Sequence, residues 1–223
     1  MTIADNWRAI EARVAAACER AGRPRDAVTV VAVSKHHTVD AIREALAAGV
    51  TDLGENYAQE LASKQAELGG AAVRWHFIGR LQRNKAKLVA GKVACVHAVD
   101  SVELAEELGK RAPGQSILLP VNLGGETSKG GVTPEAAPDV ARALAGVASV
   151  ALDGVMTMPP PTDDAEASRP YFEALRALRD RLQDDLGCAL PVLSMGMSDD
   201  FEIAIACGAS HVRIGTAIFG QRA

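Results

Sequence analysis

Aromatic residues and cysteines are both scarce in this chain of 223 residues. Aromatic residues make up only 4% of it, so a core drawn from its 48% hydrophobic content must consist mainly of Ala, Val, Leu and Ile. The four cysteines, Cys18, Cys95, Cys188 and Cys207, include no CxxC pair. This pattern predicts buried thiols in a cytoplasmic protein rather than a disulfide framework or a redox motif.

Long hydrophobic runs and blocks of like charge are also missing. No apolar stretch is long enough to span a membrane. Residues 1–20 carry charges throughout and have apolar residues at helical spacing, which predicts a helix and not a signal peptide. A formal net charge of -4 without a basic block gives no electrostatic footprint for nucleic acid or anionic lipid. We expect a small molecule or another protein as partner, and a monomer because no apolar helix face demands a second copy.

What the sequence does contain is an alternation of short apolar runs with amphipathic helical stretches. The runs are VTVVAVS, DLGENY, VRWHFIG, ACVHAVD, SILLPVNL, LDGVMTM, VLSMGMS and HVRIGTAIFG. About eight such β/α units predict a single (β/α)8 TIM barrel over residues 1–223, with an extra N-terminal helix. A doubly wound open parallel sheet is the alternative, because a strand count from one sequence is uncertain by a strand or two.

Lys35 ends the first apolar run, on the face of a barrel where enzymes build their sites. A lysine held among apolar groups is less stable as an ammonium, so its pKa falls from about 10.4 toward neutrality. The free amine is then a nucleophile for a carbonyl group. A lysine at a strand end can equally be reaching water, and position alone does not separate the two interpretations.

The last two runs carry the features of a phosphate site. Ser198 and the backbone amides after it could face an anion, while Gly215 allows close backbone approach and Thr216 adds a hydroxyl. The loops after strands seven and eight are the usual phosphate-binding loops of a TIM barrel. Ser198 is also a candidate N-cap, and Asp199 and Asp200 in the same first turn would suit a purely structural helix start.

A nucleophilic lysine beside a phosphate site suggests a ligand with both a carbonyl group and a phosphate. Pyridoxal phosphate fits this description, and so do the sugar phosphates of Schiff-base aldolases. Arg213, on the last run, could hydrogen-bond a pyridine nitrogen and keep it unprotonated, because a guanidinium does not give up its proton. A structural ion pair is the alternative for a strand arginine.

Two polar loops, residues 124–131 and 159–170, follow the fifth and sixth runs. The first resembles a phosphate loop, but Lys129 precedes Gly130, so the Gly-Lys-Ser/Thr order of a nucleoside triphosphate site is absent. The second is expected to be a surface connection.

The five histidines show no HxxxH pattern and no neighbouring carboxylate at ligand spacing, so no metal site is expected. His36 and His37 would project to opposite sides if the first strand continued through them. His76, in RWHFIG, could lie in the core or behind a site.

Five motifs together resemble a known family. They are AVSK at 32–35, GENYAQE at 54–60, WHFIGRLQRNK at 75–85, GMSDD at 196–200 and VRIGTAIFG at 212–220. In this order and at these distances, over nearly the whole chain, they are similar to the pyridoxal 5'-phosphate homeostasis proteins of the YggS/PROSC type. The resemblance implies the barrel of the alanine racemase N-terminal domain and a cofactor, pyridoxal 5'-phosphate, held as an internal aldimine of Lys35.

The same resemblance implies roles for other cofactor-binding residues. It places Ser198, Gly215 and Thr216 at the phosphate, Arg213 at the ring nitrogen and Asn56 near the ring.

Three further positions carry weaker expectations. Met156, in the sixth run, is proposed to pack on the ring, and Lys129 matches a family lysine that could serve as a secondary amine for cofactor transfer. Family members commonly continue SKTKP where this chain has SKHHT. Any role of a second lysine there is therefore in doubt, whereas Lys35 is unaffected.

The resemblance favours a carrier over an enzyme. Racemisation needs acid and base groups on both faces of the cofactor, and alanine racemases add a β-domain for this purpose. The chain ends three residues after Gly220, so we expect no such domain. We expect a protein without catalytic activity that sequesters pyridoxal phosphate, supplies it to apo-enzymes and regulates the intracellular pool. The alternatives are a pyridoxal-phosphate enzyme such as a small amino-acid racemase, and a Schiff-base aldolase.

Overall fold

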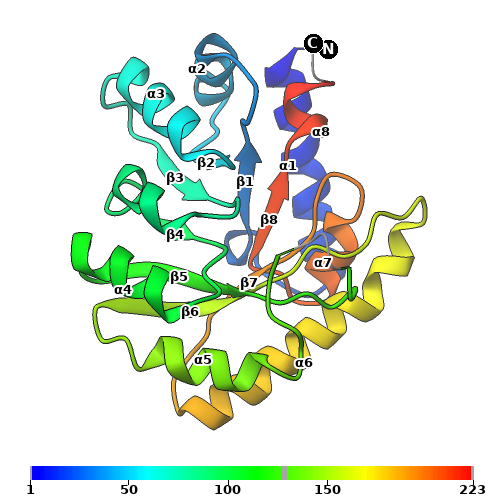
Figure 1. Ribbon diagram of the computed structural model, residues 1–223. Helices are drawn as coiled ribbons and strands as arrows, with labels where there is room; N and C mark the ends of the chain where they lie inside the picture. The colour runs from blue at the N-terminus through cyan, green and yellow to red at the C-terminus, as the bar shows by residue number, and fades with distance from the viewer. Residues whose placement is uncertain (1, 127–129, 222–223) are drawn as a thin grey trace.

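Eight parallel strands close into a barrel in the computed structural model, which describes residues 2–126 and 130–221. The strands follow one another around the barrel in chain order, and β8 pairs with β1 (Figure 1). The strands are β1 Thr29–Val33, β2 Asp52–Glu55, β3 Arg74–Phe77, β4 Cys95–Val96, β5 Gln115–Pro120, β6 Val150–Met156, β7 Val192–Ser194 and β8 His211–Ile214. The predicted TIM barrel is confirmed, and the open doubly wound sheet is wrong.

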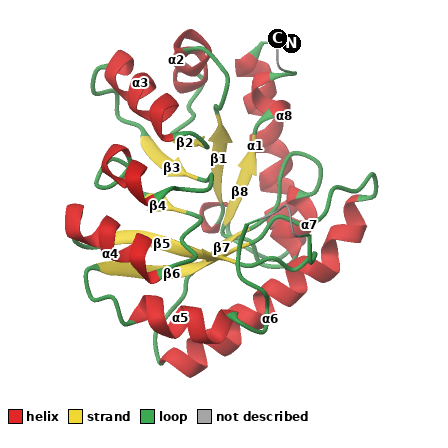
Figure 2. Cartoon of the chain, viewed as in Figure 1, coloured by secondary structure: helices red, strands yellow, loops and turns green. Residues whose placement is uncertain are grey.

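Helices surround the barrel on its outside (Figure 2). The α-helices are α1 Ile3–Arg20, α2 Val39–Ala47, α3 Ala58–Leu68, α4 Val102–Arg111, α5 Ala137–Ala145, α6 Arg169–Leu186, α7 Phe201–Ala206 and α8 Thr216–Phe219. Short 3-10 helices are η1 Arg25–Ala27, η2 Arg83–Leu88 and η3 Ala165–Ser168. The expected N-terminal helix is therefore present, as α1.

Local sequence explains where several elements begin and end. Thr2 and Asp5 form a capping box at the start of α1, and the Thr38 hydroxyl accepts a hydrogen bond from the Ala41 amide at the start of α2. Helix α6 ends at Gly187, whose φ of 64° is the left-handed conformation that glycine adopts most readily. Strand β1 and the following Lys35 therefore lie between α1 and α2, two helices with defined N-caps.

The connection between β3 and β4 departs from the β/α repeat. It holds only the 3-10 helix η2, and β4 itself is only two residues long. Ala86 and Val89 from this segment are buried in the main hydrophobic cluster, so the short helix still covers its part of the barrel wall.

The apolar core has two parts on opposite faces of the sheet. Ile117 and Leu119 belong to a large cluster shared with the helices, while Leu118 belongs to a small one with Cys95 and Met156. Because side chains alternate across a strand, the small cluster lies inside the barrel. The barrel interior also holds buried polar residues, among them His76, His97 and Ser194.

The cysteine prediction is correct for three residues and wrong for one. Cys18, Cys95 and Cys207 are buried, but Cys188 is exposed because it follows Gly187 in the connection after α6. Within residues 2–126 and 130–221, no helix combines the length and the hydrophobicity needed to cross a membrane.

Candidate functional site

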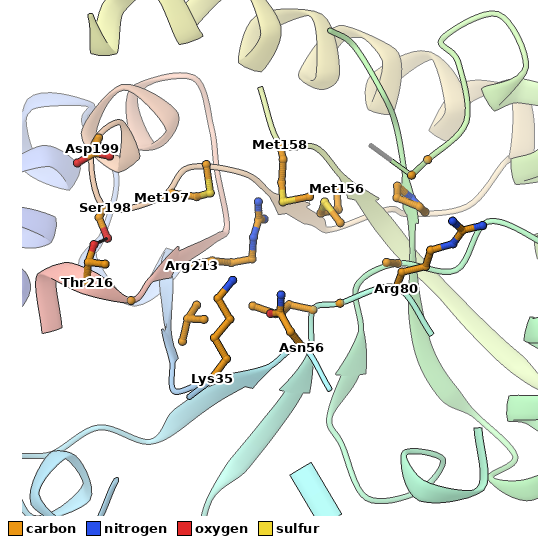
Figure 3. Close-up of a pocket in the computed structure, with 18 of the residues that line it drawn as sticks. Lys35, Asn56, Arg80, Met156, Met158, Met197, Ser198, Asp199, Arg213 and Thr216 are labelled. Atoms are coloured by element: carbon orange, nitrogen blue, oxygen red, sulfur yellow. Dashed lines mark hydrogen bonds between the residues drawn. The ribbon is translucent and has the colours of Figure 1, made fainter. Parts of the chain in front are cut away.

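A pocket of about 380 Å³ lies where the strands end at the carboxyl face of the barrel (Figure 3). Every residue predicted from the sequence to bind a cofactor lines it. These residues are Lys35, Asn56, Met156, Ser198, Arg213, Gly215 and Thr216. The structure thus brings residues near the first strand, such as Lys35, together with residues of the last strand, such as Arg213. Their roles in binding a cofactor remain predictions.

Lys35 enters the pocket from the end of β1. The strand stops at Val33, the buried Ser34 follows, and the lysine side chain points into the pocket beside Asn56 and Arg213 (Figure 3). Its backbone does not continue as a strand, because His36 has a φ of 66°. The alternating projection of His36 and His37 that a continued strand would give therefore does not occur.

Ser198 and Thr216 lie opposite one another at one side of the pocket. The Thr216 hydroxyl donates to the Ser198 hydroxyl over 3.3 Å, and Gly215 precedes the threonine at the start of α8. Two hydroxyls and a glycine backbone at adjoining strand ends form a polar rim that suits a phosphate.

The alternative role of Ser198 as the N-cap of a helix is wrong. Helix α7 begins at Phe201, and its N-cap is Asp200. The Asp200 carboxylate accepts the Met197 amide at 2.7 Å, which closes a turn and moves the helix start beyond the serine. Gly196 permits this turn, since its φ is 90° and an added Cβ would lie 2.5 Å from the Ala204 side chain.

Arg213 is buried at the floor of the pocket, with 4% of its surface exposed. Its guanidinium donates to the Ser194 hydroxyl at 2.6 Å and to the Thr157 carbonyl at 2.9 Å. Burial lowers its pKa to about 10, which leaves it protonated at neutral pH. These two partners are a hydroxyl and a carbonyl, so they do not form the structural ion pair considered for this residue.

A chain of hydrogen bonds runs from Arg213 through the barrel interior. Ser194 Oγ is 2.9 Å from His97 Nδ1, His97 Nε2 is 3.0 Å from His76 Nδ1, and His76 Nε2 is 2.8 Å from Asp52 Oδ1. A guanidinium can only donate and an ionised carboxylate can only accept. If His97 and His76 are neutral, each hydrogen bond in this series must therefore run in one direction. Every N–H or O–H donates to the group that is one step farther from Arg213 and closer to Asp52.

The electrostatics of the interior agree with a neutral His97 and a neutral His211. Burial holds the pKa of His97 well below its usual range and lowers that of His211 to about 4. For Asp52, burial acts to raise the pKa, but the hydrogen bonds from His76 and Thr51 outweigh it and leave the pKa below its ordinary value. His76, whose place was left open by its neighbours in sequence, thus lies in the core and behind the pocket.

Sequence reasoning missed several residues that line the pocket. They are Val33, Ile78, Gly79, Arg80, Ala98, Asp100, Pro120, Gly130, Gly131, Met158, Met197 and Asp199. Many directly follow a predicted strand, and the rule that barrels build sites at these ends could have indicated them. Lys129, the candidate secondary amine, lies outside the described residues. The described ranges contain no group of three His, Cys, Asp or Glu arranged to hold a metal ion.

The chain matches the family described as alanine racemase, N-terminal domain, over residues 6–223. A relative named pyridoxal phosphate homeostasis protein, from Aquifex aeolicus, is 46% identical and covers 94% of both chains. A second of the same name, from Pseudomonas aeruginosa, is 44% identical over 99% of this chain and 96% of its own. The protein of this name from Escherichia coli K12 is 38% identical, over 99% of this chain and 97% of its own.

Solved structures agree with these relatives. PipY of Synechococcus elongatus, determined with PLP bound, aligns with a TM-score of 0.86 at 34% identity, over 98% of this chain and 100% of its own. Alanine racemase of Corynebacterium glutamicum aligns at 0.69 with 18% identity, over 98% of this chain and 62% of the racemase, and so shows only a shared fold. The chain belongs to the pyridoxal phosphate homeostasis proteins, a family built on the alanine racemase N-terminal domain.

Proposed function

We propose that this chain binds pyridoxal 5'-phosphate covalently through Lys35 and acts in its intracellular homeostasis. The observation that carries the proposal is the convergence of one lysine, two hydroxyls and a buried guanidinium on a single pocket. The relatives' shared name and the PLP in the PipY structure support the same cofactor.

The residues present fit this cofactor in size and in chemistry. Asn56 Oδ1 is buried and makes no hydrogen bond to the described part of the chain, so it is an acceptor available to a ligand hydroxyl. Gly215 lines the pocket near Val33 and adds no side chain of its own to the space for a ligand. The hydroxyls of Ser198 and Thr216 can donate to a phosphate, and the apolar Met156 can pack against a ring.

The residues act in different ways on the bound molecule. When bound, pyridoxal phosphate supplies an aldehyde carbon that forms a C=N bond with an amine as one water molecule leaves. Lys35 presents the amine, and the polar rim of Ser198 and Thr216 fixes the other end of the ligand. Arg213 keeps its proton at neutral pH and can only donate, so it cannot protonate a ring nitrogen.

This role of Arg213 is why we propose a carrier and not an enzyme. A pyridine ring without a proton on nitrogen is a weaker electron sink, which disfavours the carbanion chemistry of racemases and decarboxylases. The chain thus sequesters the reactive aldehyde and releases it to apo-enzymes or to the free pool. We propose that it does so in the cytoplasm, as a monomer in which residues 1–223 form one domain.

The test is the absorption spectrum of the purified protein with added pyridoxal phosphate, beside that of Lys35→Ala. A visible band in the first and none in the second is expected, because Lys35 is the only lysine among the described residues that line the pocket. Lys87→Ala, which removes an exposed lysine, is the control and should keep the band. A band that persists in Lys35→Ala would contradict the attachment residue, and absence of any band would contradict the cofactor. Turnover of an amino acid that depends on Lys35 would contradict the carrier.

A further inference from the structure

A buried group of charges lies behind Lys35, between the barrel wall and α3. Lys64, on α3, has 5% of its surface exposed, and Glu55, at the end of β2, is fully buried. An ammonium taken out of water is strongly destabilising unless acceptors replace its hydration. The fold therefore holds this lysine in place by specific partners, and Lys64 is not among the residues that line the pocket.

The partners of Lys64 use all of its donors. Its Nζ lies 2.6 Å from the Ser34 carbonyl oxygen, 2.7 Å from Glu55 Oε1 and 2.7 Å from Glu60 Oε1. An ammonium has three N–H groups, so each can point at one acceptor. Such a complete set fixes the position of all three acceptors relative to one another.

Two of these contacts reach the backbone on either side of Lys35. The Ser34 carbonyl belongs to the peptide group that precedes Lys35, and Lys64 binds it. The His36 amide belongs to the peptide group that follows, and it donates to Glu60 Oε1 at 2.6 Å. Both peptide planes that define φ and ψ of Lys35 are thus tied to one ion cluster.

Two further features show that this backbone needs support. The Ser34 hydroxyl donates to Glu55 Oε1 at 2.6 Å, which adds a third tie. His36 has a φ of 66°, a left-handed conformation that is unfavourable for a residue other than glycine. Because residue 36 is strained, its conformation persists only where surrounding contacts enforce it, and the Glu60 hydrogen bond is such a contact.

We propose that Lys64, Glu55 and Glu60 form a clamp that aims Lys35 at the aldehyde. Lys64 is a positioning residue in this scheme: it touches the backbone of the lysine's neighbour and not the ligand. The inference rests on the proposed function of Lys35. Its physical basis is that a reacting group held in the productive geometry forms its bond far more readily than one that samples several backbone conformations.

The test compares two ligands in each variant. Pyridoxal phosphate can bond to Lys35, whereas pyridoxine 5'-phosphate has an alcohol in place of the aldehyde and cannot. In Lys64→Met the apolar stem remains and the three donors are lost. We expect the dissociation constant for pyridoxal phosphate to rise about tenfold and band formation to slow at least as much, with less than about a twofold change for pyridoxine 5'-phosphate.

Matched variants separate positioning from general damage. Lys87→Met loses the same charge at an exposed site and should change neither constant. Glu60→Gln keeps an oxygen that can accept from His36 and Lys64 and should resemble the wild type, while Glu60→Leu should reproduce the loss. Should Lys64→Met fail to fold, the Glu60 pair carries the test, because that side chain is partly exposed.

The outcomes distinguish this inference from the proposed function. A parallel loss of both ligands in Lys64→Met and Glu60→Leu, or no loss of either, overturns the clamp. If the wild type forms no visible band and binds both ligands alike, the proposed function of Lys35 has failed first.

Discussion

Acid should destabilise this protein through the histidines inside its barrel. Burial lowers the pKa of His211 to about 4, whereas an unfolded histidine titrates near 6.5. Below pH 6.5 the unfolded chain binds a proton that the folded chain refuses, so the free energy of unfolding falls as the pH drops from 6.5 toward 4. At about pH 5 the unfolded histidine is roughly 30-fold biased toward its protonated form, which corresponds to about 2 kcal/mol.

Neighbouring charged groups also shift the pKa of His211. His76 and the cations of Arg74 and Arg213 disfavour a proton on His211, while Asp52 favours one. Burial holds the pKa of His97 well below its usual range, so His97 adds a further loss in the same direction. The wild type should therefore lose at least the ~2 kcal/mol due to His211 between about pH 7.5 and pH 5.

Urea unfolding followed by circular dichroism at the two pH values measures this loss. His211→Gln removes one titrating group, so its loss should be smaller than that of the wild type by about 2 kcal/mol. Burial raises the pKa of Glu55 and acts in the opposite sense, but this contribution is common to all variants and cancels. His36→Asn, which removes an exposed histidine, is the matched control. An equal loss in the wild type and His211→Gln would show that the folded protein does not keep His211 neutral.

Two further substitutions test the supports of the pocket. In Gly79→Ala the new Cβ would lie 2.2 Å from the Asn56 carbonyl oxygen, so the Asn56 backbone must move; we expect a loss of ~1–3 kcal/mol in urea unfolding and weaker pyridoxal phosphate binding by absorption titration. Ser194→Ala leaves His97 Nδ1 and one Arg213 N–H without their shared partner; a loss of ~1–3 kcal/mol is expected, and unchanged stability would contradict the continuous chain.

The barrel could be predicted from the sequence because local residue patterns indicate its strands and helices. Runs such as TVVAV at β1 alternate with amphipathic stretches that have their own caps, as Thr38 shows for α2. The prediction fails where two residues compete to be the N-cap of the same helix, as at the start of α7. Asp200 takes the Met197 amide and shifts the start of α7, and no pattern in the sequence says that the carboxylate two residues after Ser198 will prevail.

The pocket could be predicted in part, and for a different reason. Lys35, Arg213 and Thr216 sit at or just beyond strand ends, and barrel closure brings all strand ends of one face together. The supports behind them could not be predicted in this way. Glu60 and Lys64 are one helical turn apart, which suggests an ordinary surface pair, and only the packing of α3 on the barrel buries the lysine.

Strand β2 contributes a residue to each of two groups of contacts behind the pocket, the hydrogen bonds that lead to Arg213 and the ion cluster around Lys64. Its side chains alternate, so Asp52 points into the barrel and ends the hydrogen-bonded chain to Arg213, while Glu55 points outward and binds Lys64 behind Lys35. Only Leu53 and Gly54 separate the two, and an added Cβ at Gly54 would lie 2.8 Å from the Val31 side chain, so the strand packs tightly against β1. A shift of β2 by one residue would exchange its faces and break both supports at once. The register of one four-residue strand therefore supports both the backbone beside Lys35 and the hydrogen bonds that lead to Arg213.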